Sequence, residues 1–173
     1  IINGIVDFCP KVRDLVSTSY DIFVPCYDKH ITSSGKLLKL LDRIFWGYQG
    51  DTIELMNNTV LSNLHSKFEG VLLDVPVGTG VFTDSKYAQF PNATIIAVDY
   101  SMGMLKKAQK RFAKKGLTNI FFVRADVGNL PLTNDSADII LSMNGLHAFP
   151  DKQRATAEMK RVIKKDGSLV ACS

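Results

Sequence analysis

The hydrophobic positions follow two different periods along the chain. From residue 37 to residue 64, apolar residues recur every three or four positions, which is the spacing of an amphipathic helix. They predict one helix over 37–45 and a second that begins at the capping box of Asp51 and Glu54 and runs to Leu64. Residues 1–34 show neither helical nor strand periodicity, so we expect them to be irregular.

Beyond residue 70, short apolar runs alternate with helical patterns. Strands are predicted over 71–75, 94–99, 120–124, 138–143 and 168–172, and helices over 81–90, 102–115 and 151–165. This alternation predicts an α/β fold, a doubly wound and mostly parallel sheet with helices on both faces. We expect one structural domain, in which residues 1–69 form a helical extension or lid and residues 70–173 form the core.

The first of these strands ends in a glycine-containing turn. The apolar run from Val71 reaches Asp74, and Gly78 and Gly80 follow at once. Glycines let a backbone approach a ligand closely, and the N-terminus of the next helix attracts anionic groups. Open α/β sheets bind nucleotide-like molecules at this carboxyl edge. The segment therefore predicts a nucleotide-type binding loop.

Two further carboxylates end the next two strands. Asp99 stands 19 residues after Gly80 (99 − 80), where a carboxylate either ends the sheet in solvent or accepts hydrogen bonds from ribose hydroxyls. Asp126 either caps its own turn or accepts from an exocyclic amino group, with the Val127 amide donating to a ring nitrogen. Together with Asp74, the three acidic residues on one rim favour a binding site.

The order of five motifs resembles the class I S-adenosylmethionine-dependent methyltransferases. The motifs are DVPVGTG (74–80), AVDYSMGML (97–105), RADVGNLPL (124–132), ADIILSMNGLHAFPD (137–151) and EMKRVIKKDGSLV (158–170). The resemblance covers about residue 70 to the end. It is closest to the ubiquinone/menaquinone-biosynthesis C-methyltransferases, whose Tyr-Asp-rich N-terminal segment has a looser counterpart in Tyr20-Asp21 and Tyr27-Asp28.

The resemblance implies a Rossmann-like methyltransferase fold and S-adenosylmethionine as cofactor, with S-adenosylhomocysteine as product. It assigns the methionine end of the cofactor to Asp74 and to the loop from Val75 to Gly80, which includes Pro76, Gly78 and Thr79. It assigns the ribose to Asp99 and the adenine to Tyr100, Met102, Asp126 and Val127. Met143 and Asn144 are assigned to the region of the sulfonium. Pro76 departs from the family, which usually has a glycine there. The family also has two further strands after the fifth, which this sequence does not contain.

The methyl acceptor is expected to be a small molecule. The Asn/Asp-Pro-Pro-aromatic motif of nucleic-acid amino methylation is replaced after the fourth strand by SMNG. Six basic residues crowd the helix predicted over 102–115, either as a solvated face or as a patch for RNA, and their position opposite Leu105, Ala108 and Phe112 favours the solvated face. We therefore expect no nucleic-acid partner.

His147 is the candidate general base. It stands just beyond the fourth strand, near the expected methyl group, and it either takes a proton from the acceptor or only packs in the loop. Tyr20 and Tyr27 are the candidate lid residues over the substrate and cofactor. No metal site is predicted.

Two alternatives stay open. A protein that binds S-adenosylmethionine without transferring methyl is suggested by Pro76 and by the short C-terminal part. An NAD(P)-dependent oxidoreductase is disfavoured, because Thr83 stands where the dinucleotide fingerprint requires its third glycine.

The composition of the chain indicates where in the cell the protein is expected. The 173 residues are 46% hydrophobic with a formal net charge of +4, and three cysteines lie far apart without metal-ligand spacing. No apolar run approaches the length of a membrane span. These features predict a soluble, cytoplasmic protein with reduced thiols.

Overall fold

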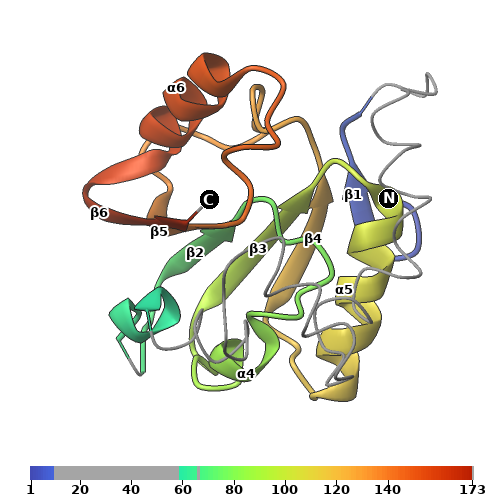
Figure 1. Cartoon of the computed structure of the whole chain (residues 1–173). Coiled ribbons are helices and arrows are strands. Elements are labelled where there is room, and N and C mark those ends of the chain that lie inside the picture. Colours follow the sequence, from blue (N-terminus) through green and yellow to red (C-terminus); the bar gives the residue numbers. More distant parts are fainter. Residues whose placement is uncertain (10–58, 66, 173) are drawn as a thin grey trace, which may run out of the picture.

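Six parallel strands form one sheet, in the order β1-β4-β3-β2-β5-β6 (Figure 1). The computed structural model of the chain describes residues 1–9, 59–65 and 67–172. The strands are β1 (Ile5–Asp7), β2 (Val71–Asp74), β3 (Thr94–Asp99), β4 (Ile120–Arg124), β5 (Ala137–Met143) and β6 (Ile163–Cys172). The strand order reverses at β2, which pairs with β3 on one side and β5 on the other. The α/β prediction is therefore confirmed.

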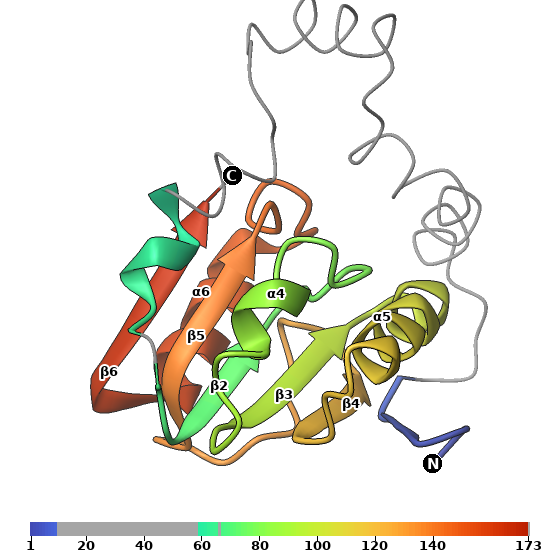
Figure 2. The same cartoon turned by 90° about the horizontal axis from the view of Figure 1, so that it is seen from below.

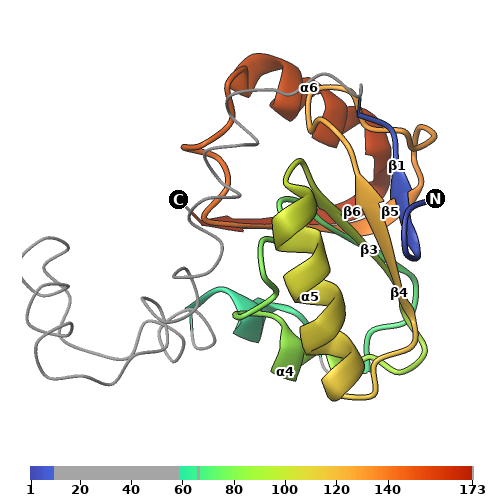
Figure 3. The same ribbon diagram turned by 90° about the vertical axis from the view of Figure 1, so that its right-hand side faces the viewer.

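Helices cover both faces of the sheet. Helices α4 (Asp84–Tyr87) and α5 (Met102–Lys114) lie on one face, and α6 (Lys152–Val162) lies on the other (Figure 2). A 3₁₀ helix, η1 (Leu61–Asn63), packs on the α4 and α5 face. Figure 3 shows the same layers from the side, with α6 set apart from α4 and α5.

The alternation of side chains along β2 connects the two layers. Leu72 belongs to the apolar cluster under α4 and α5, and Leu73 belongs to the cluster under α6, because successive strand residues point to opposite faces. Both side chains are fully buried. A short run that is apolar at every position is typical of a strand covered on both faces.

Strand β1 was not predicted. Residues 1–9 were expected to be irregular, but Ile5–Asp7 pairs in parallel with Phe122–Arg124 of β4. Ile5 is 0% exposed and belongs to the same cluster as Phe112 and Phe122. The strand is too short for its period to be recognised in the sequence, and pairing with β4 stabilises it.

The helix predicted over 81–90 is much shorter than expected. Only Asp84–Tyr87 is α-helical. The amides of Thr83 and Asp84 both donate to the carbonyl of Gly80, which forms turns rather than continuous helix before residue 84. After α4, the amides of Gln89 and Phe90 donate to carbonyls only three residues back, so the chain tightens towards Pro91.

The helix predicted over 151–165 ends early, and the strand that follows begins early. Helix α6 ends at Val162, and Ile163 already pairs with Ala137 of β5. The carbonyls of Arg161 and Val162 accept hydrogen bonds from the amides of Asp135 and Ser136, which draws the chain out of the helix. The next pair is Ile139 with Ser168, so the residues between Ile163 and Ser168 bulge out of the ladder.

The remaining sequence-based boundaries agree closely with the structure. Strands β3 and β4 have the predicted limits, β2 ends one residue earlier, and β5 begins one residue earlier. The helix predicted over 37–45 lies outside the described residues. Of the helix predicted from 51 to 64, only the end is described, and it contains η1.

Candidate functional site

The carboxyl ends of the parallel strands bring the predicted site residues to one edge of the sheet. Asp74 ends β2, Asp99 ends β3 and Met143 ends β5, and the segment that contains Asp126 follows β4. Because all the strands run parallel, these residues meet at the same edge, on both sides of the point where the strand order reverses. Open α/β sheets bind their ligands in such a crevice.

The glycine turn has the backbone that its residues require. Gly78 and Gly80 have φ angles of +57° and +69°, in the left-handed region that glycine adopts at no steric cost. A Cβ atom on Gly80 would lie 2.4 Å from Cζ of Phe112 in α5, so only glycine fits there. A Cβ atom on Gly78 would meet none of the described residues within 4 Å. Among the described residues, the turn is thus packed against α5 at Gly80 and uncrowded at Gly78.

Asp99 joins this turn to the start of α5. Its Oδ2 atom accepts from the amide of Gly78 at 2.8 Å, and its Oδ1 atom accepts from the amide of Ser101 at 2.8 Å. Ser101 caps α5, since its hydroxyl accepts from the amide of Met104. Asp99 is only 8% exposed. A carboxylate only accepts hydrogen bonds, which suits it both to these amides and to the hydroxyls of a ligand.

Asp74 lies deeper, beneath the turn. It is 1% exposed, and its Oδ2 atom accepts from the Tyr87 hydroxyl at 2.6 Å. The pKa of Asp74 is raised to about 7, chiefly by burial; the hydrogen bond from Tyr87 opposes the rise, and the Asp99 charge adds to it. Burial and the neighbouring Asp74 also hold the pKa of Tyr87 well above its usual value. Within the described part of the chain, Oδ1 of Asp74 has no hydrogen-bond partner.

The segment after β4 is held by α6. Asp126 is exposed, and its Oδ1 atom accepts from the amide of Gly128 at 2.8 Å, which is the turn-capping arrangement. The guanidinium of Arg154 donates to the carbonyl of Gly128 at 3.2 Å. Arg161 donates to the carbonyls of Leu130 and Leu132 at 3.0 and 2.7 Å, so α6 anchors the whole segment. Val127 packs against the α6-side cluster.

Tyr100 and Met102 stand at the start of α5, next to Asp99. The guanidinium of Arg124 lies 5.7 Å from the centre of the Tyr100 ring, and its Nε atom donates to the Tyr100 carbonyl at 2.9 Å. The same guanidinium forms an ion pair with Asp7 of β1 at 3.4 Å. Met102 is half-buried and packs against the cluster beneath α5. Strand β1 thus contributes to this end of the sheet edge.

Pro76 packs against the loop after β5. A Cβ atom on Gly145 would lie 2.1 Å from Cδ of Pro76, so the two residues are in direct contact and position 145 has no room for a side chain. The Val75–Pro76 peptide bond is cis. The departure from the family at position 76 is therefore matched by a glycine in the facing loop.

The loop after β5 also contacts the end of β6. The amide of Asn144 donates to the carbonyl of Cys172 at 3.1 Å, and the thiol of Cys172 lies 3.9 Å from Sδ of Met143. Asn144 has a φ angle of +52°, which asparagine tolerates better than most residues. His147 follows in the same loop and is exposed. Both candidate lid residues, Tyr20 and Tyr27, lie outside the described residues.

The sequence did not reveal the contacts that two residues make at this edge. Tyr87 holds Asp74 from α4, and Arg111 donates from α5 to the carbonyl of Thr79 at 3.0 Å. Arg111 was grouped with the solvated basic face of its helix. Arg111 stands one residue before the buried Phe112, at the border of the apolar face of the helix. This position was the signal in the sequence that its side chain could reach the turn.

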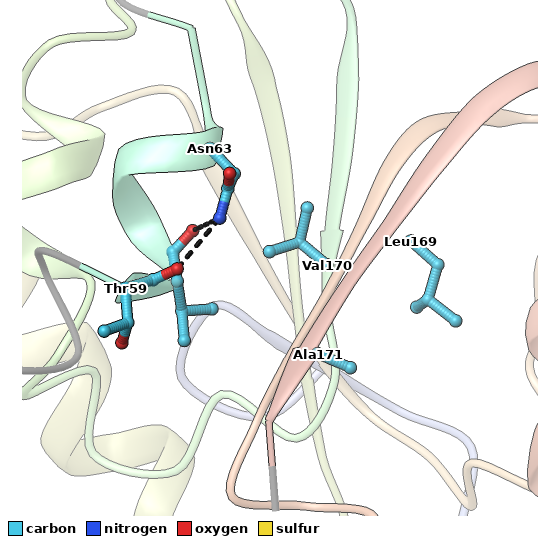
Figure 4. A pocket seen from close by; sticks show the side chains of 6 residues that line it. Thr59, Asn63, Leu169, Val170 and Ala171 are labelled. Carbon is cyan, nitrogen blue, oxygen red and sulfur yellow. Dashed lines mark hydrogen bonds between the residues drawn. The ribbon is translucent and has the colours of Figure 1, made fainter.

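A separate pocket lies between η1 and β6 (Figure 4). It has a volume of about 310 Å³ and is lined by Thr59, Val60, Asn63, Leu169, Val170 and Ala171. Val170 points towards η1, and Leu169 points away from it. None of the predicted site residues lines this pocket, so we do not assign the cofactor to it. No group of His, Cys, Asp or Glu side chains that could hold a metal ion occurs in the described ranges.

Comparison with known proteins identifies the family. A family model described as "Methyltransferase domain" matches residues 72–167. The chain is 39% identical over 107 residues to an uncharacterized chloroplastic methyltransferase of Arabidopsis thaliana, covering 58% of this chain and 30% of the relative. It is 32% identical over 112 residues to the demethylmenaquinone methyltransferase of Chlamydia caviae, covering 65% of this chain and 47% of the relative. Among solved structures, the YcgJ protein from Bacillus subtilis matches with a TM-score of 0.59 and 28% identity, covering 69% of this chain and 48% of that one.

The open parallel sheet, with a glycine turn and carboxylates at its switch point, defines an α/β domain for a nucleotide-type cofactor. The chain belongs to the methyltransferase domain family, whose model covers more than half of its 173 residues. This confirms the resemblance, the Rossmann-like fold and S-adenosylmethionine as the cofactor, and it leaves the oxidoreductase alternative without support. The chain spans less than half the length of the two curated relatives.

The described helices give one further fact about the protein's environment. None of them is both long enough and apolar enough to cross a membrane.

Proposed function

We propose that this protein transfers a methyl group from S-adenosylmethionine to a small-molecule acceptor at the carboxyl edge of its sheet. The observation that carries the proposal is the bond between the Asp99 carboxylate and the Gly78 amide, which joins the ends of β2 and β3 beside an open glycine. In a chain of the methyltransferase domain family, a carboxylate beside a glycine turn at the switch point of the sheet supports binding of a nucleoside-containing donor.

The cofactor fits the residues at this edge. None of the described residues crowds the Cβ position of Gly78, and a carboxylate such as that of Asp99 is an acceptor suited to the hydroxyls of a ribose. In the proposed arrangement, the methionine end of the cofactor lies along Asp74 and the Val75–Gly80 loop, and the ribose binds Asp99. The adenine lies among Tyr100, Met102, Asp126 and Val127. The reacting methyl group lies near Met143 and Asn144.

When bound, S-adenosylmethionine supplies a methyl group that its sulfonium already activates. The residues of the chain therefore have to orient donor and acceptor and exclude water, which contributes about 7–11 kcal/mol to the reduction of a barrier in well-oriented reactions. His147 takes the proton from an acceptor that must lose one. Its exposed position in the loop after β5 leaves it accessible to a substrate.

A small-molecule acceptor is supported by two observations. The residues after β5 are SMNG rather than the motif for amino groups in nucleic acid, and one relative is named a demethylmenaquinone methyltransferase. The exposed lysines of α5 form a solvated face, so we propose no nucleic-acid partner. The segment that contains Tyr20 and Tyr27, between β1 and η1, would close over the site as a lid, and the protein would act in the cytoplasm.

A screen of candidate acceptors with detection of S-adenosylhomocysteine tests this function. The proposal predicts product that depends on both the protein and the acceptor. Saturable binding of S-adenosylmethionine without turnover on any acceptor class would contradict catalysis and favour a non-catalytic binding protein instead.

A further inference from the structure

The three residues at the centre of the glycine turn are each held by a different anchor. The amide of Gly78 donates to Asp99 of β3. The carbonyl of Thr79 accepts from Arg111, and Gly80 packs against the ring of Phe112. Two of the three anchors are therefore neighbouring residues of α5.

Arg111 connects the turn to the helix that follows it. Its Nε atom donates to the Thr79 carbonyl at 3.0 Å, and its Nη1 atom lies 3.5 Å from Oδ2 of Asp84 in α4. The side chain of Arg111 is 25% exposed and that of Asp84 is 12% exposed, so the contact is largely shielded from solvent. One planar guanidinium thus holds the turn and α4 at the same time, which a single ammonium group does less well.

We propose that Arg111 is a positioning residue for the donor loop, which fixes the Thr79 carbonyl so that the turn keeps the geometry that receives the amino-acid end of S-adenosylmethionine. The inference rests on the proposed function, because it assigns the methionine end to this loop. Without the guanidinium, the Thr79 carbonyl loses its charge-assisted bond and the turn loses its link to α4. The adenosine end, bound elsewhere on the edge, keeps its contacts.

The same helix supplies matched controls. Lys110 and Lys114 are basic residues of α5 that flank Arg111 in the sequence, but both are exposed. A change to glutamine at either position removes the same charge as at Arg111 and leaves the turn untouched. The controls therefore separate the contact with Thr79 from the general charge of the helix.

The test compares two ligands by calorimetry. S-adenosylhomocysteine carries the amino-acid end, and 5′-methylthioadenosine lacks it. For R111Q we expect the affinity for S-adenosylhomocysteine to fall about tenfold, which corresponds to about 1.4 kcal/mol. The affinity for 5′-methylthioadenosine should stay within about twofold of wild type, and K110Q and K114Q should bind both ligands as wild type does.

Two further variants keep the outcome decisive. R111K retains one donor and should recover part of the lost affinity, and D84N removes the ion pair while leaving the bond to Thr79. If R111Q does not fold, R111K gives the same comparison of ligands. Equal losses for both ligands, or none for either, would overturn the role of Arg111. A wild-type protein that binds neither ligand would instead overturn the proposed function.

Discussion

Among the residues that the structure describes, Asp74 is the most deeply buried carboxylate. Its burial raises its pKa to about 7, with Asp99 adding to the rise and the Tyr87 hydroxyl opposing it. Because this pKa lies above the unfolded value of 3.8, the folded protein keeps a proton that the unfolded chain releases. Stability from this group is therefore complete below about pH 4 and is lost as the pH rises to about 7.

The variant Asp74→Asn tests whether the stability contribution of Asp74 falls as the pH rises. Asparagine keeps an acceptor for Tyr87 and does not ionise. We expect the unfolding free energy of wild type, relative to the variant, to fall between pH 4.5 and pH 7, by at most about 1.4 kcal/mol per pH unit. Denaturant titrations at several pH values measure the difference. A constant difference over this range would show that Asp74 ionises normally in the folded protein.

His147 should matter for turnover and not for cofactor binding. With an acceptor that must lose a proton, His147→Ala should lower kcat by about 10²–10⁴-fold, the usual contribution of a positioned base, while the affinity for S-adenosylhomocysteine stays unchanged. His65→Ala is the control, because His65 is also exposed and lies outside the proposed site. Turnover of His147→Ala equal to that of wild type would exclude the base role.

At the scale of residues, the sequence predicted the groups that end strands and missed those that come from helices. Asp74 and Asp99 follow strand signals, so their common edge could be foreseen. Tyr87 and Arg111 act through helix geometry, and their partners depend on how α4 and α5 pack on the sheet. For Asp126 the structure has the turn-capping bond, which was one of its two alternatives, and the adenine contact stays a prediction.

The contact between the loops after β2 and β5 leads to a prediction about elements. Gly145→Ala places a methyl group 2.1 Å from Cδ of Pro76, so one loop must move. We expect a loss of about 1–3 kcal/mol in unfolding free energy, which is typical of overpacking at a tight site. Gly128→Ala is the matched control, because its added Cβ would meet its nearest neighbours only at 3.4 Å. Equal stability of the two variants, measured by denaturation, would mean that the loops separate freely.

Strand β1 should contribute to the stability of the core. Ile5 is 0% exposed, so Ile5→Ala should cost about 2–5 kcal/mol, the usual range for truncating a buried aliphatic side chain. Ile2 lies on the same short segment but is 48% exposed, so Ile2→Ala should change stability by less than about 0.5 kcal/mol. The denaturation midpoints of the two variants, compared with that of wild type, measure these effects. A similar small effect for both would place β1 outside the cooperative fold.

Element boundaries were predictable wherever local pattern and pairing agree. Strands β3 and β4 combine apolar runs with parallel pairing, and their limits were correct. The end of α6 was wrong because the amides of Asp135 and Ser136 capture its last carbonyls, a contact from a distant segment. Strand β1 escaped prediction for the same reason, since only its pairing with β4 makes it a strand.

At the scale of the whole molecule, the fold, the family and the cofactor are consistent with one another. The sheet order and the glycine turn define one edge of the sheet, and the match to the methyltransferase domain over residues 72–167 covers the strands that form it. The chain spans 47% of the demethylmenaquinone methyltransferase that it resembles, and the identity of its acceptor is the subject of the acceptor screen.

Calorimetric titration with S-adenosylhomocysteine, for wild type and for Asp99→Ala, tests cofactor binding at this edge most directly. We predict one saturable site on wild type, and a loss of about 1.5–3 kcal/mol of binding free energy in the variant, because charge-assisted bonds to the ribose are removed. Absence of binding to the wild-type protein, or equal affinity of the two proteins, would contradict the assignment of the cofactor to the carboxyl edge of β2 and β3.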